Sequence, residues 1–263
     1  MIEATIQNKL RESFNPDGSQ LRNHQLRLLE IMKVIDRICR SNEIDYWLGS
    51  GTLLGAVRHG GFIPWDDDMD IDIMFKDKKR FIEAFERDLP SNMYLQYDKT
   101  DPSYFNAFLK IRDESEPLHQ IITIEGKEYE LDEKYKGSFI DVFTEEFASP
   151  FLVKLCNYMF DKSFVIYYAR GSKWGARLYY KMCKVFASVA RLIPFFKNKD
   201  YLYHTYGSHF NSRRKYTDIF PLCEVTFEGE SFYAPGNWDS YLTALFGDYM
   251  KLPDSKKTAH IFE

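Results

Sequence analysis

The acidic segment IPWDDDMDIDIMF, residues 63–75, constrains the fold of this chain more than any other part of the sequence. From Asp68 onward, acidic and apolar residues alternate, which is the period of a β-strand with one face in the core. Asp68, Asp70 and Asp72 then share one face, and the apolar residues between them point into the core. The segment therefore predicts a half-buried strand that carries three neighbouring carboxylates.

Three carboxylates on one strand face repel one another unless a cation lies among them. Clustered oxygen ligands are typical of Mg²⁺ or Mn²⁺ sites. The alternative is a solvated polar edge, which explains the alternation but not the choice of aspartate, a poor strand former. A twelve-residue calcium loop starting at Asp66 is excluded, because Ile71 stands where that loop needs glycine and Asp77 where it needs glutamate.

A glycine turn, LGSGT, follows a short apolar segment at residues 44–48, about eighteen residues before the acidic strand. Backbone amides near Gly49, together with the hydroxyls of Ser50 and Thr52, can hold phosphate oxygens at the start of a helix. The turn is not a Walker A loop, because no Gly-Lys-Ser/Thr follows. It is not a dinucleotide fingerprint, because Leu54 replaces the third glycine. Alternatively, it is a tight strand-to-helix turn without a ligand.

Strand, Gly-Ser turn, short helix and Asp-x-Asp strand together form the arrangement of nucleotidyltransferases. In that arrangement a third carboxylate comes from a neighbouring strand. Asp141 in GSFIDVFT is the natural candidate, since apolar residues flank it on both sides. The alternative role for Asp141 is a strand-end aspartate that bonds to a turn.

The remaining periodicity predicts an α/β (α+β) fold, a mixed sheet with flanking helices. Strands are expected at residues 44–48, 66–75, 93–98, 104–113, 119–125, 127–132, 137–144 and 225–229. Helices are expected at residues 21–40, 77–89 and 238–246, and residues 150–200 have helical spacing throughout.

The composition of the 263-residue chain is that of a folded globular protein, with 44% hydrophobic and 28% charged residues. We expect no secretory signal, because no basic stretch followed by an apolar run stands at the start. No stretch approaches the roughly 20 apolar residues of a membrane span. The four cysteines lie far apart, so we expect reduced thiols and a cytoplasmic protein.

Charge is segregated along the chain. Residues 147–216 carry thirteen Lys/Arg and two acids, a net charge of +11, whereas the whole chain has −4. We therefore divide the chain into a catalytic core, residues 1–146 plus 216–263, and a basic, aromatic-rich helical insertion, residues 147–215. Nucleic acid is not expected as a partner, because no base-reading motif accompanies the charge.

On a helical wheel, residues 173–193 place their basic side chains opposite an apolar side. One interpretation is a helix that lies on an anionic membrane, with residues 150–200 as the contact and the inner face of the membrane as the location. The other is a core-packed helix whose basic face is solvated or meets the acidic body.

The motif WLGSGTLLGAVRHGGFIPWDDDMDIDI resembles the signature of LicD-type phosphotransferases, a family related to fukutin-like proteins. The resemblance continues in FLKIRD, FIDVF, FPLCEVTFEG and WDSYLTALFGDYMKLP, over residues of about 25–145 and 216–253. It implies a nucleotidyltransferase-like fold and transfer of a phosphorylated alcohol, such as phosphocholine, from a CDP-linked donor to a glycan hydroxyl, free or on a lipid-linked precursor. By motif, Asp68, Asp70 and Asp141 would bind the metal, with Asp66 and Asp72 left open.

Four basic side chains are further candidates for binding substrate: Arg58, His59, Lys110 and Arg112. The guanidinium of Arg58 can grip phosphate, or form a salt bridge with a local aspartate. Lys110 and Arg112 alternate on one strand face and either point at a diphosphate or are solvated. Two other functions stay open, namely NMP transfer with release of pyrophosphate and a non-catalytic module that binds a membrane or an anionic glycan.

Overall fold

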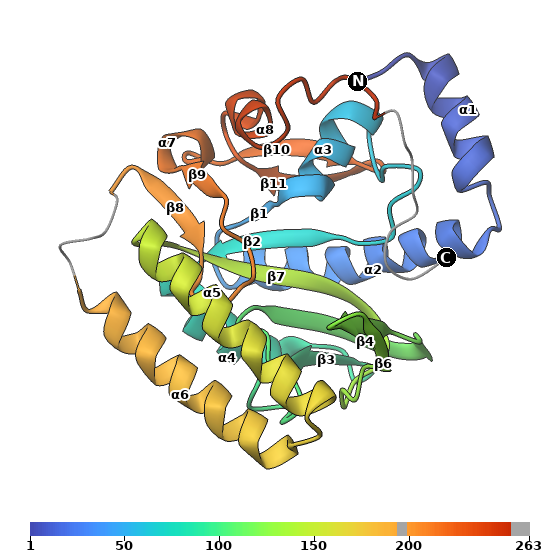
Figure 1. The fold of residues 1–263 in the computed structure, drawn as a ribbon. Coiled ribbons are helices and arrows are strands. Elements are labelled where there is room, and N and C mark those ends of the chain that lie inside the picture. Colours follow the sequence, from blue (N-terminus) through green and yellow to red (C-terminus); the bar gives the residue numbers. More distant parts are fainter. Residues whose placement is uncertain (194–198, 254–263) are drawn as a thin grey trace.

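A mixed β-sheet with helices on both sides forms the centre of the molecule in the computed structural model, which describes residues 1–193 and 199–253 (Figure 1). The strands are β1 (Tyr46–Leu48), β2 (Asp70–Met74), β3 (Met93–Gln96), β4 (Leu109–Pro117), β5 (Ile121–Ile124), β6 (Lys127–Glu130), β7 (Gly137–Phe147), β8 (Tyr201–His204), β9 (Arg213–Lys215), β10 (Cys223–Phe227) and β11 (Glu230–Ala234). The α-helices are α1 (Ala4–Phe14), α2 (Gln20–Ser41), α3 (Ser50–His59), α4 (Lys78–Asp88), α5 (Pro150–Phe164), α6 (Lys173–Arg191), α7 (Tyr216–Ile219) and α8 (Trp238–Phe246). The expected α/β (α+β) class is confirmed.

The main sheet has the order β1-β2-β7-β4-β3, with β8 beside the end of β7 and β9 beside β8. Strands β2 and β7 run parallel, and the other neighbours in this sheet run antiparallel. The acidic strand β2 is therefore central, with β1 on one side and β7 on the other. Two small hairpins, β5-β6 and β10-β11, lie outside the main sheet.

One face of the sheet is apolar and packs on α2 and α4, which lie behind it in Figure 1. Alternation along β2 and β7 places Ile71, Ile140 and Val142 on this face, and all three are fully buried. Helix α2 presents its own apolar stripe to them, and Ser19 caps its first turn by accepting a hydrogen bond from the Arg22 amide at 3.2 Å. The opposite face of the sheet is left to polar side chains.

Helices α5 and α6 form an antiparallel-looking pair at the lower left of Figure 1, joined by a short π-helical stretch at Val165–Ala169. They share a second, smaller apolar core with β8, which is distinct from the core under the main sheet. This pair lies in the segment that the sequence predicts to be a basic helical insertion.

Five elements escaped the sequence analysis: α1, α7, β8, β9 and β11. Strands β8 and β9 have only four and three residues, too few to give a periodic signal, yet they join the main sheet from within residues 147–215. Residues 104–108, expected to begin a strand, precede β4 without being part of it. The division into a core and an insertion stays a prediction, and its residues 194–198 and 254–263 lie outside the described residues.

Among residues 1–193 and 199–253, no helix combines the length and the apolar content needed to cross a membrane. The four cysteines are free thiols, three of them buried.

Candidate active site

The polar face of the sheet brings together a carboxylate from each of two neighbouring strands. Parallel pairing of β2 with β7 puts Asp70 directly beside Asp141, and antiparallel pairing of β7 with β4 puts Lys110 on the other side of Asp141. The Lys110 ammonium lies 2.9 Å from Asp141 Oδ1. The three side chains thus form a row across three strands, with the third carboxylate where the sequence predicts it.

Negative charge accumulates at the start of β2. Burial, followed by the charges of Asp68, Asp141, Asp72 and Asp66, raises the pKa of Asp70 well above its usual range. Burial and the neighbouring Asp68, to which it is hydrogen-bonded, likewise raise the pKa of Asp66. Carboxylates in this condition are poised to accept a cation, because a bound cation removes both the repulsion and the need for a proton.

The glycine turn is fixed directly to the acidic strand. The Gly49 amide donates to the Asp70 carbonyl at 3.1 Å, and the Asp70 amide donates to Thr52 Oγ1 at 2.8 Å. A side chain at position 49 is excluded, because its Cβ would lie 2.6 Å from Asp72 Oδ2. The N-terminus of α3 is therefore held against the carboxylates.

This helix terminus has unused hydrogen-bond donors. The Leu53 amide bonds to the Gly49 carbonyl, and the Ser50 amide donates to the Tyr241 hydroxyl at 3.4 Å. The amides of Gly51 and Thr52 have no acceptor within the part of the chain that the structure describes. Free amides at a helix N-terminus, with the positive end of the helix dipole, form an anion site.

A buried ionic network lies behind the turn. Asp72 Oδ1 accepts from His204 Nε2 at 3.0 Å, and the Arg214 guanidinium lies 3.0 Å from Glu145 and donates to Ser50 Oγ at 3.1 Å. Burial, and next the charge of Arg214, lower the pKa of His204 to about 4. Burial raises the pKa of Glu145 to about 8 against the opposing charge of Arg214. The Arg214 guanidinium therefore supplies the positive charge of this buried network.

Two groups of side chains could hold a metal. Asp72, Glu145 and His204 have ligand atoms within 4.8 Å of one another and are compatible with a metal. In that triad, however, Arg214 already supplies a positive charge to Glu145. The half-buried carboxylates around Asp70 offer only oxygen, and the Lys110 ammonium lies 2.9 Å from Asp141 among them. Buried Asp72 Oδ2 beside them has no hydrogen-bond partner in the residues described. Oxygen-only ligand sets of this kind are typical of Mg²⁺ and Mn²⁺ sites.

Arg58 and His59 lie at the opposite end of α3 from the glycine turn. Arg58 Nη1 donates to the Tyr249 carbonyl at 2.8 Å, and its Nε donates to His59 Nε2 at 2.9 Å. His59 Nδ1 donates to Gln7 Oε1 at 2.6 Å. Burial, and next the charge of Arg58, lower the pKa of His59 to about 3. These contacts join α1, α3 and the chain after α8, and a role in binding substrate stays a prediction for both residues.

Lys110 and Arg112 share one face of β4, as the alternation predicts, but their surroundings differ. Lys110 lies beside Asp141, and burial lowers its pKa. Arg112 is fully buried, and all three of its nitrogens donate hydrogen bonds. The acceptors are the side chains of Gln96 and Gln120, the Gly137 carbonyl and, at 2.7 Å, the Glu133 carboxylate. Lys110 is thus part of the site, whereas the hydrogen bonds of Arg112 hold strand β4 to its neighbours.

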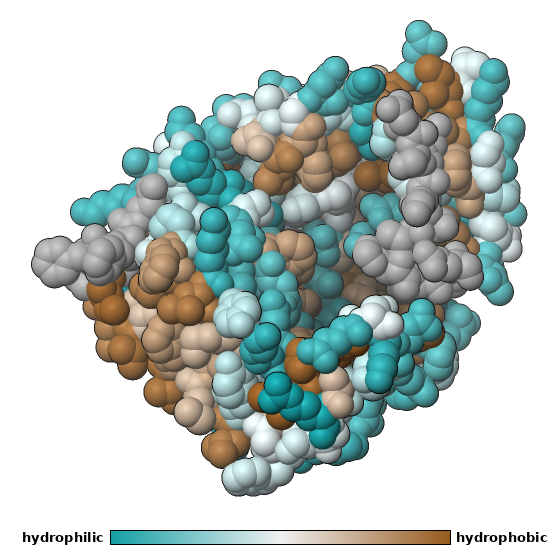
Figure 2. Space-filling model, in the orientation of Figure 1, coloured by the Kyte–Doolittle hydropathy of each residue, from teal (hydrophilic) through white to brown (hydrophobic). Residues whose placement is uncertain are grey.

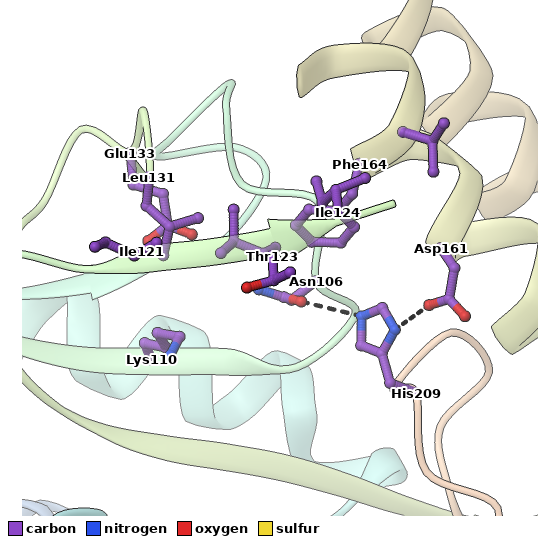
Figure 3. Close-up of a pocket in the computed structure, with 12 residues that line it drawn as sticks. Asn106, Lys110, Ile121, Thr123, Ile124, Leu131, Glu133, Asp161, Phe164 and His209 are labelled. Carbon is purple, nitrogen blue, oxygen red and sulfur yellow. Dashed lines mark hydrogen bonds and ion pairs between the residues drawn. The ribbon is translucent and has the colours of Figure 1, made fainter. Parts of the chain in front are cut away.

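A cavity of about 420 Å³ opens next to Lys110, between the β5-β6 hairpin and the C-terminal end of α5 (Figure 3). Its walls are mainly apolar, with isoleucines of β5 facing Phe164. At its other end, His209 is hydrogen-bonded to Asp161 and, at 3.1 Å, to Asn106 Oδ1. The cavity adjoins the carboxylates through Lys110 and is wide enough for a small organic group.

Sequence reasoning missed the network of His204, Glu145 and Arg214. Nothing in the local sequence marked these residues, since Glu145 ends a strand and Arg214 stands in a basic RRK tract. Only the pairing of β8 with both β7 and β9 brings them under the glycine turn. The residues that the structure does bring together as predicted are Gly49, Ser50, Thr52, Asp70, Asp141 and Lys110, with Asp68 next to Asp66.

Comparison with known proteins now adds the family. The model of the family described as LicD/FKTN/FKRP, nucleotidyltransferase domain, matches residues 43–166, which include the turn, β2, β4 and β7. The chain is 28% identical over 268 residues to lipopolysaccharide cholinephosphotransferase LicD of Haemophilus influenzae, with 92% of this chain and 97% of that protein aligned.

Two eukaryotic relatives match shorter stretches. Human ribitol 5-phosphate transferase FKRP is 42% identical over 50 residues, 19% of this chain and 10% of that protein. Mannosyltransferase regulator 4 of Saccharomyces cerevisiae is 30% identical over 78 residues, 29% of this chain and 7% of that protein. The match along nearly all of the bacterial enzyme, the family domain and the arrangement of the turn and the carboxylates agree: the chain is similar to LicD-type proteins along most of its length and is an enzyme of the phosphotransferase type.

Proposed function

We propose that this enzyme transfers a phosphorylated alcohol from a CDP-linked donor to a hydroxyl of a glycan, free or on a lipid-linked precursor, and releases CMP. The observation that carries the proposal is the pairing of Asp70 with Asp141 beside the free amides of α3. A relative named as a cholinephosphotransferase and another named as a ribitol 5-phosphate transferase support transfer of a phosphate with its alcohol attached.

Asp68, Asp70 and Asp141 would hold Mg²⁺ or Mn²⁺, with Asp66 and Asp72 nearby. The metal would neutralise the charge of the donor diphosphate. The oxygen-only donor set and the raised pKa of Asp70 support this assignment, since a bound cation would relieve the repulsion among these carboxylates.

The protein groups have separable tasks. The Gly51 and Thr52 amides bind a phosphate oxygen, and Lys110 adds a positive charge beside Asp141. Asp141 also lies where it can accept the proton of the acceptor hydroxyl. The cavity beside Lys110 receives the alcohol of the donor or the sugar that carries the hydroxyl.

In the reaction, the acceptor oxygen forms a bond to the distal phosphorus of the donor. The phosphoanhydride bond breaks, and CMP leaves with the bridging oxygen. The acceptor proton passes to Asp141 or to water. The location we propose is the cytoplasm, at the inner face of the membrane, which the free thiols support.

The test is a screen of CDP-choline, CDP-ribitol and CDP-glycerol with a glycan acceptor, in which CMP release is followed with Mg²⁺ and with EDTA. We expect one donor to give metal-dependent CMP release, and Asp70→Asn to lower the rate at least 100-fold. Asp45→Asn is the control, because Asp45 is exposed and lies at the start of β1. Turnover that survives EDTA and Asp70→Asn would refute the proposal.

Nucleotide transfer is the second candidate, because the matching family domain is described as a nucleotidyltransferase domain. In that reaction the NMP joins the acceptor and pyrophosphate leaves. The mass of the product decides: a mass increase equal to NMP would replace our proposal with this one.

A further inference from the structure

Helix α6 has three faces, although a helix packed on a protein core normally has two. A narrow face of small residues and one tyrosine packs on α5 and is buried: Ala176, Tyr180, Cys183, Ala187 and Ala190. A second face carries the basic residues. The third face is apolar and turned to solvent.

The apolar face, which we call the α6 stripe, consists of Trp174, Leu178, Met182, Val185, Val189 and Leu192. Their spacing of three or four residues places them in one line along the helix. Their exposed fractions range from 44% for Leu178 to 79% for Leu192. Figure 2 shows brown side chains gathered along α6 at the lower left of the molecule. A line of six exposed large apolar side chains on one helix is unusual for a surface that faces only water.

The ion pairs of α6 confirm one part of the second interpretation of the wheel, that its basic face meets the acidic body, while the expected packing of its apolar side on the core is wrong for the α6 stripe. The basic side chains at three positions meet the acidic body: Lys173 pairs with Asp132 at 2.6 Å, Lys184 with Asp98 at 2.5 Å, and Arg191 with Glu146 at 2.9 Å. These pairs anchor α6 to the molecule from the side. The side of the helix opposite the basic residues is therefore free of the core instead of packed into it.

Unpaired basic residues lie on α5, on α6 and in the stretch that joins them. Lys154, Arg170 and Lys181 are exposed and have no carboxylate partner within the described residues. Asp161 is the single acid between residues 151 and 193, and it is bonded to His209. Since the chain outside residues 147–216 carries a net charge of −15, an anionic surface would attract this side of the molecule and repel the other.

We propose that the α6 stripe is a docking surface for an anionic lipid bilayer. The helix would lie parallel to the membrane plane, with the six apolar side chains among the acyl chains and the exposed lysines and arginine at the headgroups. Trp174 and the exposed Tyr158 of α5 lie where aromatic side chains anchor proteins at a membrane interface.

The charges favour a bilayer over a second copy of this chain. A symmetric dimer through the stripe would bring Lys181 and Arg170 of both copies together with no acid to pair them. A bilayer with anionic headgroups instead complements every exposed charge along α6. Helix α5 separates the stripe from the cavity beside Lys110, and its end lines that cavity. Docking would therefore bring the cavity close to the membrane surface.

Vesicle flotation of the purified full chain tests the proposal, with neither metal nor nucleotide present. We expect it to bind vesicles that contain phosphatidylglycerol and to bind phosphatidylcholine vesicles much more weakly. Met182→Glu/Val189→Glu should lower the partition coefficient at least tenfold. Ile6→Glu/Leu26→Glu is the matched control, because it adds the same charge at apolar side chains that are 40% and 42% exposed on other helices, and it should bind as the parent does.

A second variant keeps the test independent of helix stability. Lys154→Gln, Arg170→Gln and Lys181→Gln should each weaken binding to anionic vesicles about fivefold and leave binding to neutral vesicles unchanged. Absence of binding by the unchanged protein would overturn the proposal. Equal losses of vesicle binding in the stripe variant and the control variant would also overturn it. A third contradicting result is a dimer in sedimentation that Met182→Glu/Val189→Glu dissociates, with no vesicle binding by the dimer or by the monomer.

Discussion

Replacing Gly49 by alanine is predicted to destabilise the fold although the backbone at this position suits alanine. Gly49 has φ −94° and ψ 157°, an extended conformation open to any residue. The added Cβ, however, would lie 2.6 Å from Asp72 Oδ2, whereas ordinary contact begins at 3.4 Å. The Asp72 carboxylate would thus have to retreat by about 0.8 Å.

That retreat is expensive because Asp72 is buried and its other carboxylate oxygen is hydrogen-bonded. Its backbone lies between β1 and β7, and its Oδ1 accepts from His204 at 3.0 Å. Overpacking in such a site costs about 1–3 kcal/mol. Weakening the hydrogen bond to His204 adds about 1 kcal/mol. We therefore expect Gly49→Ala to lower the free energy of unfolding by about 2–4 kcal/mol.

Gly51, two residues on, is the matched control. There the nearest atom to an added Cβ is Asp66 Oδ2 at 3.6 Å, an ordinary contact, and the residue is in the first turn of α3. Gly51→Ala should raise the free energy of unfolding by up to about 1 kcal/mol, because alanine loses less backbone entropy on folding. Urea unfolding followed by circular dichroism measures both. Equal stabilities for the two variants would refute the role given to Gly49.

Two further predictions concern buried polar groups. The pKa of His59 is about 3 in the folded chain and about 6.5 in the unfolded chain, so protonation of His59 favours the unfolded chain as the pH falls below 6.5. His59→Gln keeps an acceptor for Arg58, and it should reduce the stability lost between pH 7.5 and 5 by about 2 kcal/mol. Urea titrations at the two pH values measure this loss, and an unchanged loss would contradict the prediction. Arg112→Met should lower the free energy of unfolding by about 3–5 kcal/mol, because it leaves the buried carboxylate of Glu133 without its partner. Adding Glu133→Gln should recover part of that free energy. No recovery in the same unfolding assay would mean that the ion pair is not the cause.

The sequence predicts the central elements of the site because they are coded locally. Alternating aspartates mark β2, glycines mark the turn before α3, and apolar neighbours mark the strand of Asp141. Each signal depends on residues within about ten positions of one another. The pairing of Asp70 with Asp141 followed from the arrangement that these signals form together.

What the sequence could not predict depends on contacts between distant segments. Arg214 reaches Ser50 across 164 positions, and His204 reaches Asp72 across 132. Likewise, a helical wheel shows that α6 has a basic and an apolar side, but not which of them faces the body. That choice depends on acids at Asp98, Asp132 and Glu146, on strands and loops far from the helix.

The central claim is that a divalent metal binds between β2 and β7, at Asp70 and Asp141, and not in the buried triad of Asp72, Glu145 and His204. Binding of Mn²⁺ followed by electron paramagnetic resonance, with Asp141→Asn compared with Glu145→Gln, tests it most directly. We predict that Asp141→Asn lowers the affinity for Mn²⁺ at least tenfold. Glu145→Gln should leave this affinity within about twofold, because it replaces a carboxyl group whose pKa is raised to about 8. The reverse order, with Glu145→Gln losing the metal and Asp141→Asn keeping it, would contradict the claim.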